Sequence, residues 1–192
     1  MTSIVGITVN GVSRVGVVHK PVTYSNEDVG ESYFGTLECG GFKMSFDPLQ
    51  PEGRKRGEIV PLTTFDQAPM REDANIRVTY SSTLKNKEDL DKYLQPFTIV
   101  EPESSGVAGK LSRMYDDEID AYVYPNTGME YWDVAAPEAI FRGNFGAVNA
   151  AYIDNFAYDP EISSKLGCPG CIFAKNKHVL DLVMKRLSKI LK

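Results

Sequence analysis

Alternating apolar residues open the chain and predict a sheet of antiparallel strands. Residues 4–9 alternate isoleucine and valine with small or polar residues, and Asn10-Gly11 follows them as a hairpin turn. The apolar run at 12–18 predicts the returning strand, which ends at Lys20-Pro21. Further along, the patterns at 33–37 and 42–46 predict a second hairpin with Gly40-Gly41 between its strands. We therefore assign residues 1–73 to an antiparallel β segment.

The pattern changes after a stretch rich in proline, glycine and charge at residues 47–75, which predicts a loop between two segments. From residue 74 onward, short apolar runs alternate with helical patterns, so residues 74–192 are expected to form a smaller α/β unit with helices on the sheet faces. The expected strands lie at 74–80, 97–100, 121–124, 148–153 and 172–174, and the expected helices at 86–94, 110–117, 134–141 and 176–190. The predicted fold class is a layered α/β sandwich.

The last helix has the clearest helical period. Val179, Val183, Leu187 and Ile190 form one apolar stripe, and Asn176 precedes them as a candidate N-cap. Packing against a core explains this stripe fully, so we assign no site to it.

Composition narrows the class of protein. The chain of 192 residues is 42% hydrophobic and 24% charged, as in ordinary globular proteins, and its net charge of −5 argues against a general nucleic-acid binder. No apolar run is long enough to span a membrane, and the first residues lack the features of a signal peptide. Three cysteines, an odd and small number, suit a reducing compartment, so we expect a cytoplasmic protein.

Two of the cysteines form a Cys-x-x-Cys motif at Cys168 and Cys171. This spacing fits a redox pair or half of a zinc site. However, the chain has no second pair, and its only histidines are His19 and His178. We favour the simpler interpretation, a loop that leads into the next strand.

The most informative stretch is residues 119–146. A strand at 121–124 ends in the turn residues Pro125-Asn126-Thr127-Gly128, and a good helical run begins after Trp132 and Asp133. Asp is a favoured N-cap residue, and Pro137 suits the first turn, so we expect Asp133 at a helix N-terminus. Free backbone N–H groups and the helix dipole favour an anion there. From spacing alone, Asp133 also fits a plain helix cap.

A second candidate anion site precedes another predicted helix. Small residues in the stretch Ser104-Ser105-Gly106-Val107-Ala108-Gly109-Lys110 let backbone N–H groups approach a phosphate. Small residues before a helix are common, so this turn by itself is weak evidence.

The segment Asp-Ala-Tyr-Val-Tyr-Pro followed by Trp-Asp-x-x-Ala-Pro-Glu-Ala-Ile resembles the third motif of the lithium-sensitive, magnesium-dependent phosphomonoesterases. That superfamily includes inositol monophosphatases, inositol polyphosphate 1-phosphatases and 3'(2'),5'-bisphosphate nucleotidases, and Ala-Pro-Glu is most similar to the last branch. The resemblance implies that Asp133 binds a catalytic Mg²⁺ ion. It also implies substrate-facing roles for Ser81, Ser105, Gly106, Lys110 and Tyr124.

The resemblance covers nearly all of this chain but only about the last 60% of the family's length. Residues 6–11, 16–21 and 34–42 follow the family's β-rich middle, which comes directly after its second metal motif, Asp-Pro-x-Asp-Gly-Thr. That motif and the family's first metal-binding Glu are absent here. The family also has Ser-His where this chain has Ser81-Ser82, and Gly-Gly where it has Phe145-Gly146.

By resemblance, the full enzyme would remove the 3'-phosphate of adenosine 3',5'-bisphosphate, and an inositol phosphate is the alternative substrate. Because two metal motifs are missing, we expect this chain alone to be inactive. A non-catalytic fragment or partner subunit is the alternative of another class. The first segment would expose a sheet edge and a sheet face, so we expect either the missing N-terminal half or self-association to cover them.

Overall fold

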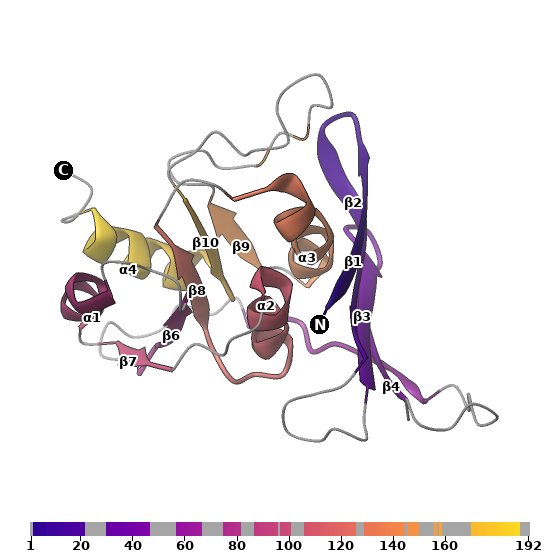
Figure 1. Ribbon diagram of the computed structural model, residues 1–192, viewed down its shortest axis with the longest axis horizontal. Helices are drawn as coiled ribbons and strands as arrows, with labels where there is room; N and C mark the ends of the chain where they lie inside the picture. The colour runs from indigo at the N-terminus through magenta and orange to yellow at the C-terminus, as the bar shows by residue number, and fades with distance from the viewer. Residues whose placement is uncertain are drawn as a thin grey trace.

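The structure is a computed structural model. It describes residues 2–21, 30–46, 57–66, 75–81, 87–95, 97–100, 106–125, 129–144, 146–149, 156, 158 and 170–188. Two five-stranded sheets and four helices form alternating layers (Figure 1). This mixed α/β architecture confirms the predicted fold class. None of the helices within these residues is long and apolar enough to cross a membrane.

The first sheet is antiparallel throughout, as predicted. Its strands run in chain order: β1 (Ser3–Val9), β2 (Val12–Lys20), β3 (Gly30–Thr36), β4 (Gly40–Phe46) and β5 (Ile59–Pro61). Asn10 and Gly11 have φ angles of 51° and 75°, the left-handed conformation that a tight hairpin turn requires. The first predicted hairpin is therefore confirmed.

Two details of the first segment differ from the sequence prediction. The second hairpin turns at residues 37–39, because Gly40 already pairs with Thr36 in β4. Strand β5 lies inside the stretch predicted to be a loop, and it was missed because only three residues of it pair with β4. Most of that stretch lies outside the described residues.

The second sheet combines parallel and antiparallel strands in the order β7-β6-β8-β10-β9. Strand β6 is parallel to both β7 and β8, whereas β10 runs antiparallel to β8 and β9. These strands span Arg77–Tyr80 (β6), Thr98–Ile99 (β7), Ala121–Tyr124 (β8), Ala147–Asn149 (β9) and Cys171–Ala174 (β10). Each overlaps a strand predicted from the sequence.

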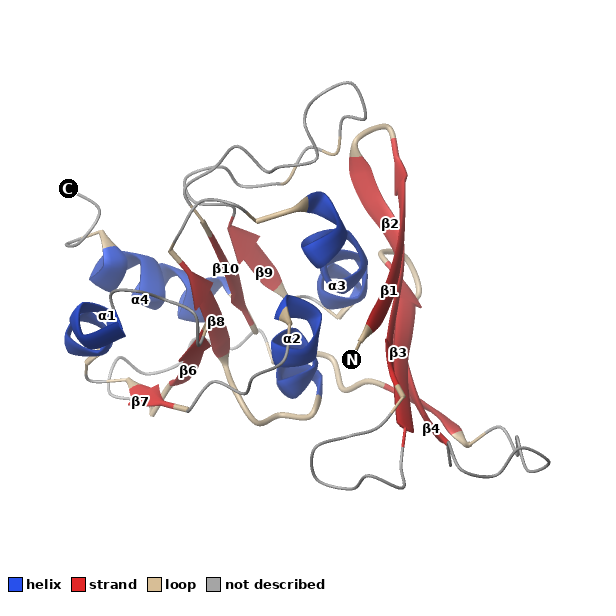
Figure 2. Ribbon diagram, in the orientation of Figure 1, coloured by secondary structure: helices blue, strands red, loops and turns tan. Residues whose placement is uncertain are grey.

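Helices separate and cover the sheets (Figures 1 and 2). Helices α2 (Val107–Tyr115) and α3 (Tyr131–Gly143) lie between the two sheets, whereas α1 (Lys87–Leu94) and α4 (Lys177–Leu187) cover the far face of the second sheet. In α4, the Asn176 side chain accepts a hydrogen bond of 2.9 Å from the Val179 N–H, which confirms the predicted cap.

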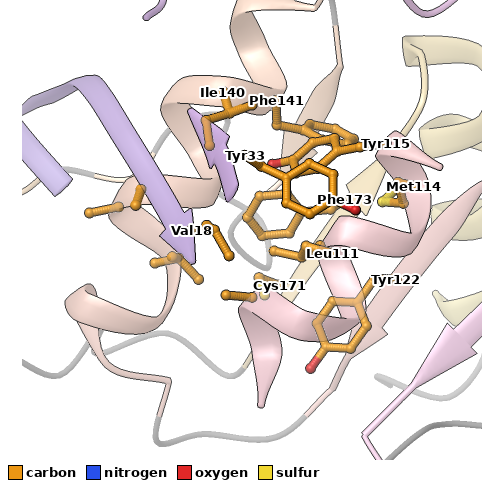
Figure 3. Close-up of a cluster of buried hydrophobic side chains, with 14 of the residues drawn as sticks. Val18, Tyr33, Leu111, Met114, Tyr115, Tyr122, Ile140, Phe141, Cys171 and Phe173 are labelled. Carbon is orange, nitrogen blue, oxygen red and sulfur yellow. The ribbon is translucent and has the colours of Figure 1, made fainter. Parts of the chain in front are cut away.

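Two hydrophobic cores hold these layers together. The first lies between the sheets, where rings of Tyr33, Tyr115, Phe141 and Phe173 pack with centroid separations of 5.4 to 6.2 Å (Figure 3). The second lies between the second sheet and helices α1 and α4. The first core joins side chains from both sides of residue 73, and the boundary between the two segments stays a prediction.

Helix α3 packs very closely on the first sheet. Gly16 of β2 faces the backbone of Ala136, and a Cβ atom at Gly16 would lie only 2.0 Å from the Ala136 carbonyl oxygen. A glycine is therefore required at residue 16 for the helix to approach the strands. This contact fixes the position of α3, which carries the candidate metal ligand.

Candidate functional site

The candidate site lies at the carboxyl ends of the parallel strands β6 and β8. Tyr80 is level with Val123 in the register of these strands, so Ser81 and Tyr124, the next residues, lie side by side where the strands end. Ser81 is buried and Tyr124 is half-buried. Ligands of open α/β sheets commonly bind at this edge of the sheet.

The N-terminus of α3 follows β8 and adds Asp133. Glu130 is the N-cap residue, and Asp133 is the third residue of the helix rather than its cap. The two residues form a reciprocal capping box, in which the Glu130 N–H donates a hydrogen bond of 3.3 Å to the Asp133 carboxylate. The predicted cap was wrong because this pairing starts the helix two residues earlier than Asp133. Asp133 still lies in the first turn, where the helix dipole acts.

Pro137 also differs from the prediction. It lies inside α3, not in its first turn. Proline has no N–H, so the Asp133 carbonyl loses the hydrogen bond that residue 137 would otherwise donate. The contacts of α3 with the first sheet hold the helix together despite this loss.

The Asp133 carboxylate has no cation beside it among the described residues. Burial raises its pKa, and the negative charge of Glu130 acts in the same direction. Burial also raises the pKa of Tyr124, as do the nearby charges of Cys171 and Asp133. The charge of Asp133 therefore acts on Tyr124, no described cation compensates it, and the functional roles of the two residues stay predictions.

Tyr122 was not identified from the sequence. Its side chain is fully buried, and its hydroxyl group has no hydrogen-bond partner among the described residues. Burial raises its pKa, and the charges of Cys171, Tyr124 and Asp133 raise it further. The two-residue period of a strand places Tyr122 and Tyr124 on the same face, and this was the signal available in the sequence. Figure 3 shows Tyr122 and Cys171 at the lower end of the first core.

The N-terminus of α2 supplies the other predicted residues. Gly106 is the N-cap and is exposed, and a Cβ atom there would meet no atom within 4 Å. Lys110 lies one turn into the helix and is only 4% exposed. A lysine this deeply buried should affect folding as well as any binding role. Ser105 lies outside the described residues.

The second cysteine of the Cys-x-x-Cys motif also lies near the carboxyl end of β8. Cys171 is buried and opens strand β10 directly opposite Tyr124. Cys168 lies outside the described residues. Cys171 contributes packing and polarity to the site.

The residues of the candidate site fit a divalent cation in part. Asp133 offers a carboxylate that lacks a compensating cation, at a place where strand ends and a helix N-terminus meet. Within the part of the chain that the structure describes, no three His, Cys, Asp or Glu side chains gather to hold a metal ion. The described residues therefore fit one ligand of a metal centre and not the whole ligand set.

Comparisons with known proteins identify the fold. No protein-family model and no curated protein matches the sequence. Among solved structures, the chain is similar to CysQ from Bacteroides thetaiotaomicron, a bacterial member of the inositol monophosphatase family, with 24% identity and a TM-score of 0.61. That match covers 92% of this chain and 63% of CysQ.

Two further structures agree. An inositol monophosphatase from Zymomonas mobilis matches with 16% identity and a TM-score of 0.66 over 97% of this chain and 62% of its own. A calcium-bound member of the family from Staphylococcus aureus matches with 15% identity and a TM-score of 0.63, over 96% and 58%. The fold is thus that of the inositol monophosphatase family, and the chain spans about three fifths of the length of these structures.

Proposed function

We propose that this chain is the C-terminal part of a Mg²⁺-dependent phosphomonoesterase that removes the 3'-phosphate of adenosine 3',5'-bisphosphate. One observation carries the proposal: Asp133 is a partly buried carboxylate with no cation beside it among the described residues, at the carboxyl edge of a sheet in a protein with the fold of a phosphatase family. The sequence around it supports the bisphosphate nucleotidase branch through Trp132-Asp133 and the following Ala-Pro-Glu.

Each residue has a defined part in this proposal. Asp133 is a ligand of the metal, which when bound would neutralise the substrate phosphate and activate a water molecule. The α2 N-terminus at Gly106 and the buried Lys110 favour the negative charge of the substrate. Ser81 and Tyr124 line the strand ends beside Asp133. We propose Ser105 for the same group of substrate-binding residues on the resemblance alone.

A complete metal centre needs more ligands than the described residues supply. A Mg²⁺ site commonly uses one or two carboxylates together with substrate phosphates and water, and a second metal ion needs further ligands. No three metal-ligating side chains gather among the described residues. We propose that an N-terminal half with the motif Asp-Pro-x-Asp-Gly-Thr supplies the others, and that this chain by itself is a non-catalytic part of the enzyme.

The test is a phosphate-release assay with Mg²⁺ and adenosine 3',5'-bisphosphate, on the purified chain with and without that half. We expect turnover only from the combination, inhibition by lithium, and loss of turnover in Asp133→Asn. Asp181→Asn is the matched control, because Asp181 is an exposed aspartate on α4 that pairs with Lys177. Robust turnover by the chain alone that Asp133→Asn abolishes would refute the division of ligands proposed here.

The same assay compares the two candidate substrates. Inositol monophosphate is the competing substrate, because the Zymomonas mobilis structure is an inositol monophosphatase. We expect the combined enzyme to prefer the nucleotide. Faster release of phosphate from inositol monophosphate would leave the metal site intact and assign the chain to the inositol phosphatases.

A further inference from the structure

The hydroxyl group of Tyr122 is an exception among the buried tyrosines. Five tyrosines of the described residues are buried, and four of them donate a hydrogen bond from the hydroxyl group: Tyr33, Tyr80, Tyr115 and Tyr158. The Tyr122 hydroxyl is buried without a partner among the described residues. Folded proteins pair nearly all of their buried polar groups, so an unpaired one needs a physical explanation, such as a part in function.

A partner for this hydroxyl has to come from within the chain. The hydroxyl oxygen is covered by atoms of the chain itself, so a group of the substrate or of another polypeptide can reach it only by displacing them. An enclosed water molecule needs a roomy, polar cavity, which a covered oxygen lacks. The candidates are therefore nearby side chains that can change their orientation.

Tyr122 faces the layer that contains Asp133. Tyr122 and Tyr124 pack in the core between the sheets, whereas Val123 packs in the second core, on the other face of the second sheet. Helix α3, with Asp133 in its first turn, lies in the same layer as Tyr122, and Figure 3 shows the Tyr122 hydroxyl pointing away from the other labelled rings. Burial raises the pKa of Tyr122, and the charges of Cys171, Tyr124 and Asp133 raise it further, so the hydroxyl keeps its proton and can donate it.

Asp133 is the best acceptor near this hydroxyl. Among the three groups whose charges act on Tyr122, Asp133 alone has a carboxylate, which forms the strongest hydrogen bonds with a hydroxyl group. Among the described residues, this carboxylate accepts one hydrogen bond, from the Glu130 N–H at 3.3 Å, which is long for an N–H···O bond. An ionised carboxylate has about four acceptor positions. Asp133 therefore has free acceptor positions and is held weakly enough to turn.

We propose that Tyr122 is a positioning residue for Asp133 in the proposed metal site, an inference that rests on the proposed function. When Asp133 holds a divalent cation, the Tyr122 hydroxyl donates a hydrogen bond to the same carboxylate. This bond pairs the buried hydroxyl and fixes the orientation of the ligand. Removing a hydrogen bond of this kind from a metal ligand commonly lowers metal affinity roughly 10- to 100-fold. Tyr122 itself contacts neither the cation nor the substrate.

The first test measures Mn²⁺ binding to the chain combined with its N-terminal half, by electron paramagnetic resonance of the free ion. Tyr122→Phe removes only the hydroxyl, and we expect it to weaken Mn²⁺ binding about tenfold or more. Tyr80→Phe is the matched control, because Tyr80 is also fully buried and its hydroxyl donates to Asp91 at 2.7 Å. We expect Tyr80→Phe to bind Mn²⁺ as the parent does. Equal affinities of Tyr122→Phe and the parent, or equal losses in both variants, would overturn the inference.

Unfolding experiments distinguish positioning from a purely structural role. In denaturant without Mn²⁺, Tyr122→Phe should be at least as stable as the parent and Tyr80→Phe less stable, because only the Tyr80 hydroxyl has a partner to lose. This order is the reverse of the order expected for Mn²⁺ affinity. A Tyr122→Phe variant that loses as much stability as Tyr80→Phe would contradict the inference.

Asp133→Asn distinguishes failure of this inference from failure of the proposed function. If Asp133→Asn weakens Mn²⁺ binding and Tyr122→Phe does not, Asp133 is a ligand that Tyr122 does not position. If Asp133→Asn binds Mn²⁺ as tightly as the parent, or the parent binds none, the proposed function fails and this inference fails with it. A crystal with Mn²⁺ bound should place the Tyr122 hydroxyl oxygen about 2.5–2.7 Å from an Asp133 carboxylate oxygen, and a hydroxyl bonded to another group would overturn the inference.

Discussion

In the second sheet, the carboxylates at the two ends of the strands have opposite electrostatic surroundings. At the amino ends of β6 and β8, Asp120 is bound by Arg77 at 2.8 Å and by Lys175 at 3.0 Å, and the pKa of Asp120 is lowered despite its burial. At the carboxyl ends, Asp133 has no cation beside it within the part of the chain that the structure describes, and burial raises its pKa.

This difference distinguishes a carboxylate that stabilises the fold from one that is available to bind a ligand. A buried carboxylate with two cationic partners is satisfied by the fold itself, and removing it leaves those cations unpaired. A partly buried carboxylate without a cation lowers stability and persists where a ligand compensates it. Perturbed acids of this second kind mark candidate functional sites. We therefore assign Asp120 to the fold and Asp133 to the site.

The largest expected effect is a difference in the free energy of unfolding between variants of these two aspartates. Asp120→Asn should lower the free energy of unfolding by about 2–3 kcal/mol, because Arg77 and Lys175 lose their shared partner. Asp133→Asn should change it by about 0.5 kcal/mol or less, in the stabilising direction, since an amide oxygen still accepts the capping hydrogen bond. Denaturant unfolding at neutral pH measures both. Equal losses in the two variants would remove the contrast.

Lys110 should combine a structural part with a binding part. Lys110→Ala is expected to cost about 1–2 kcal/mol of stability, because the side chain is only 4% exposed and its aliphatic stem is therefore buried. Lys110→Met keeps the stem and should retain most of that stability, yet weaken substrate binding by the completed enzyme. Lys177→Ala, at a side chain that is 69% exposed, is the control. Unchanged substrate affinity in Lys110→Met would exclude Lys110 from the site.

Substitutions of two buried tyrosines should show a smaller difference in stability of the same kind. Tyr80 and Tyr122 are both fully buried on adjacent strands, but the Tyr80 hydroxyl donates a hydrogen bond of 2.7 Å to Asp91, whereas that of Tyr122 has no partner. Tyr80→Phe should cost about 1 kcal/mol, and Tyr122→Phe should leave the free energy of unfolding unchanged or raise it. Thermal or denaturant unfolding compares them. A loss in Tyr122→Phe as large as in Tyr80→Phe would show that its hydroxyl is satisfied.

The pH dependence of stability should have opposite signs at the two ends. The folded-state pKa of Asp120 is below its ordinary value of 3.8, so its contribution is present above that pH and is lost as the pH falls through the folded pKa. The folded-state pKa of Asp133 is above 3.8, so its contribution is present at lower pH and is lost as the pH rises through the folded pKa.

The two asparagine variants isolate these contributions in unfolding experiments at several pH values. The deficit of Asp120→Asn relative to the parent should grow as the pH rises from about 3, and the small advantage of Asp133→Asn should also appear only as the pH rises above about 4. An advantage of Asp133→Asn that instead grew toward acid pH would reverse the assignment of its raised pKa.

Local signals predicted much of the fold. Asn10-Gly11 specified a hairpin turn, and the stripe of Val179, Val183 and Leu187 behind the Asn176 cap specified α4. Strand β5 was missed because its pairing with β4 comes from tertiary structure and not from a local pattern. The start of α3 was misplaced because a strong local preference of Asp for the cap lost to a reciprocal pair with Glu130.

Residue type and spacing predicted a helix start near Asp133 and a strand end at Tyr124, and the family resemblance implied the functional roles of both, which stay predictions. The burial of Lys110, the unpaired hydroxyl of Tyr122 and the absence of a cation near Asp133 among the described residues depend on how distant segments pack. Such features become visible only once the layers are assembled.

The most direct test of the central claim is a Mn²⁺ soak of crystals of the chain combined with its N-terminal half, with the ion located by anomalous scattering. We expect an ion about 2.0–2.2 Å from an Asp133 carboxylate oxygen. An Asp133→Asn crystal soaked in the same way should lose that ion or bind it more weakly. An ion site that leaves Asp133 uncoordinated, or an Asp133 carboxylate turned away from the strand ends, would contradict the account.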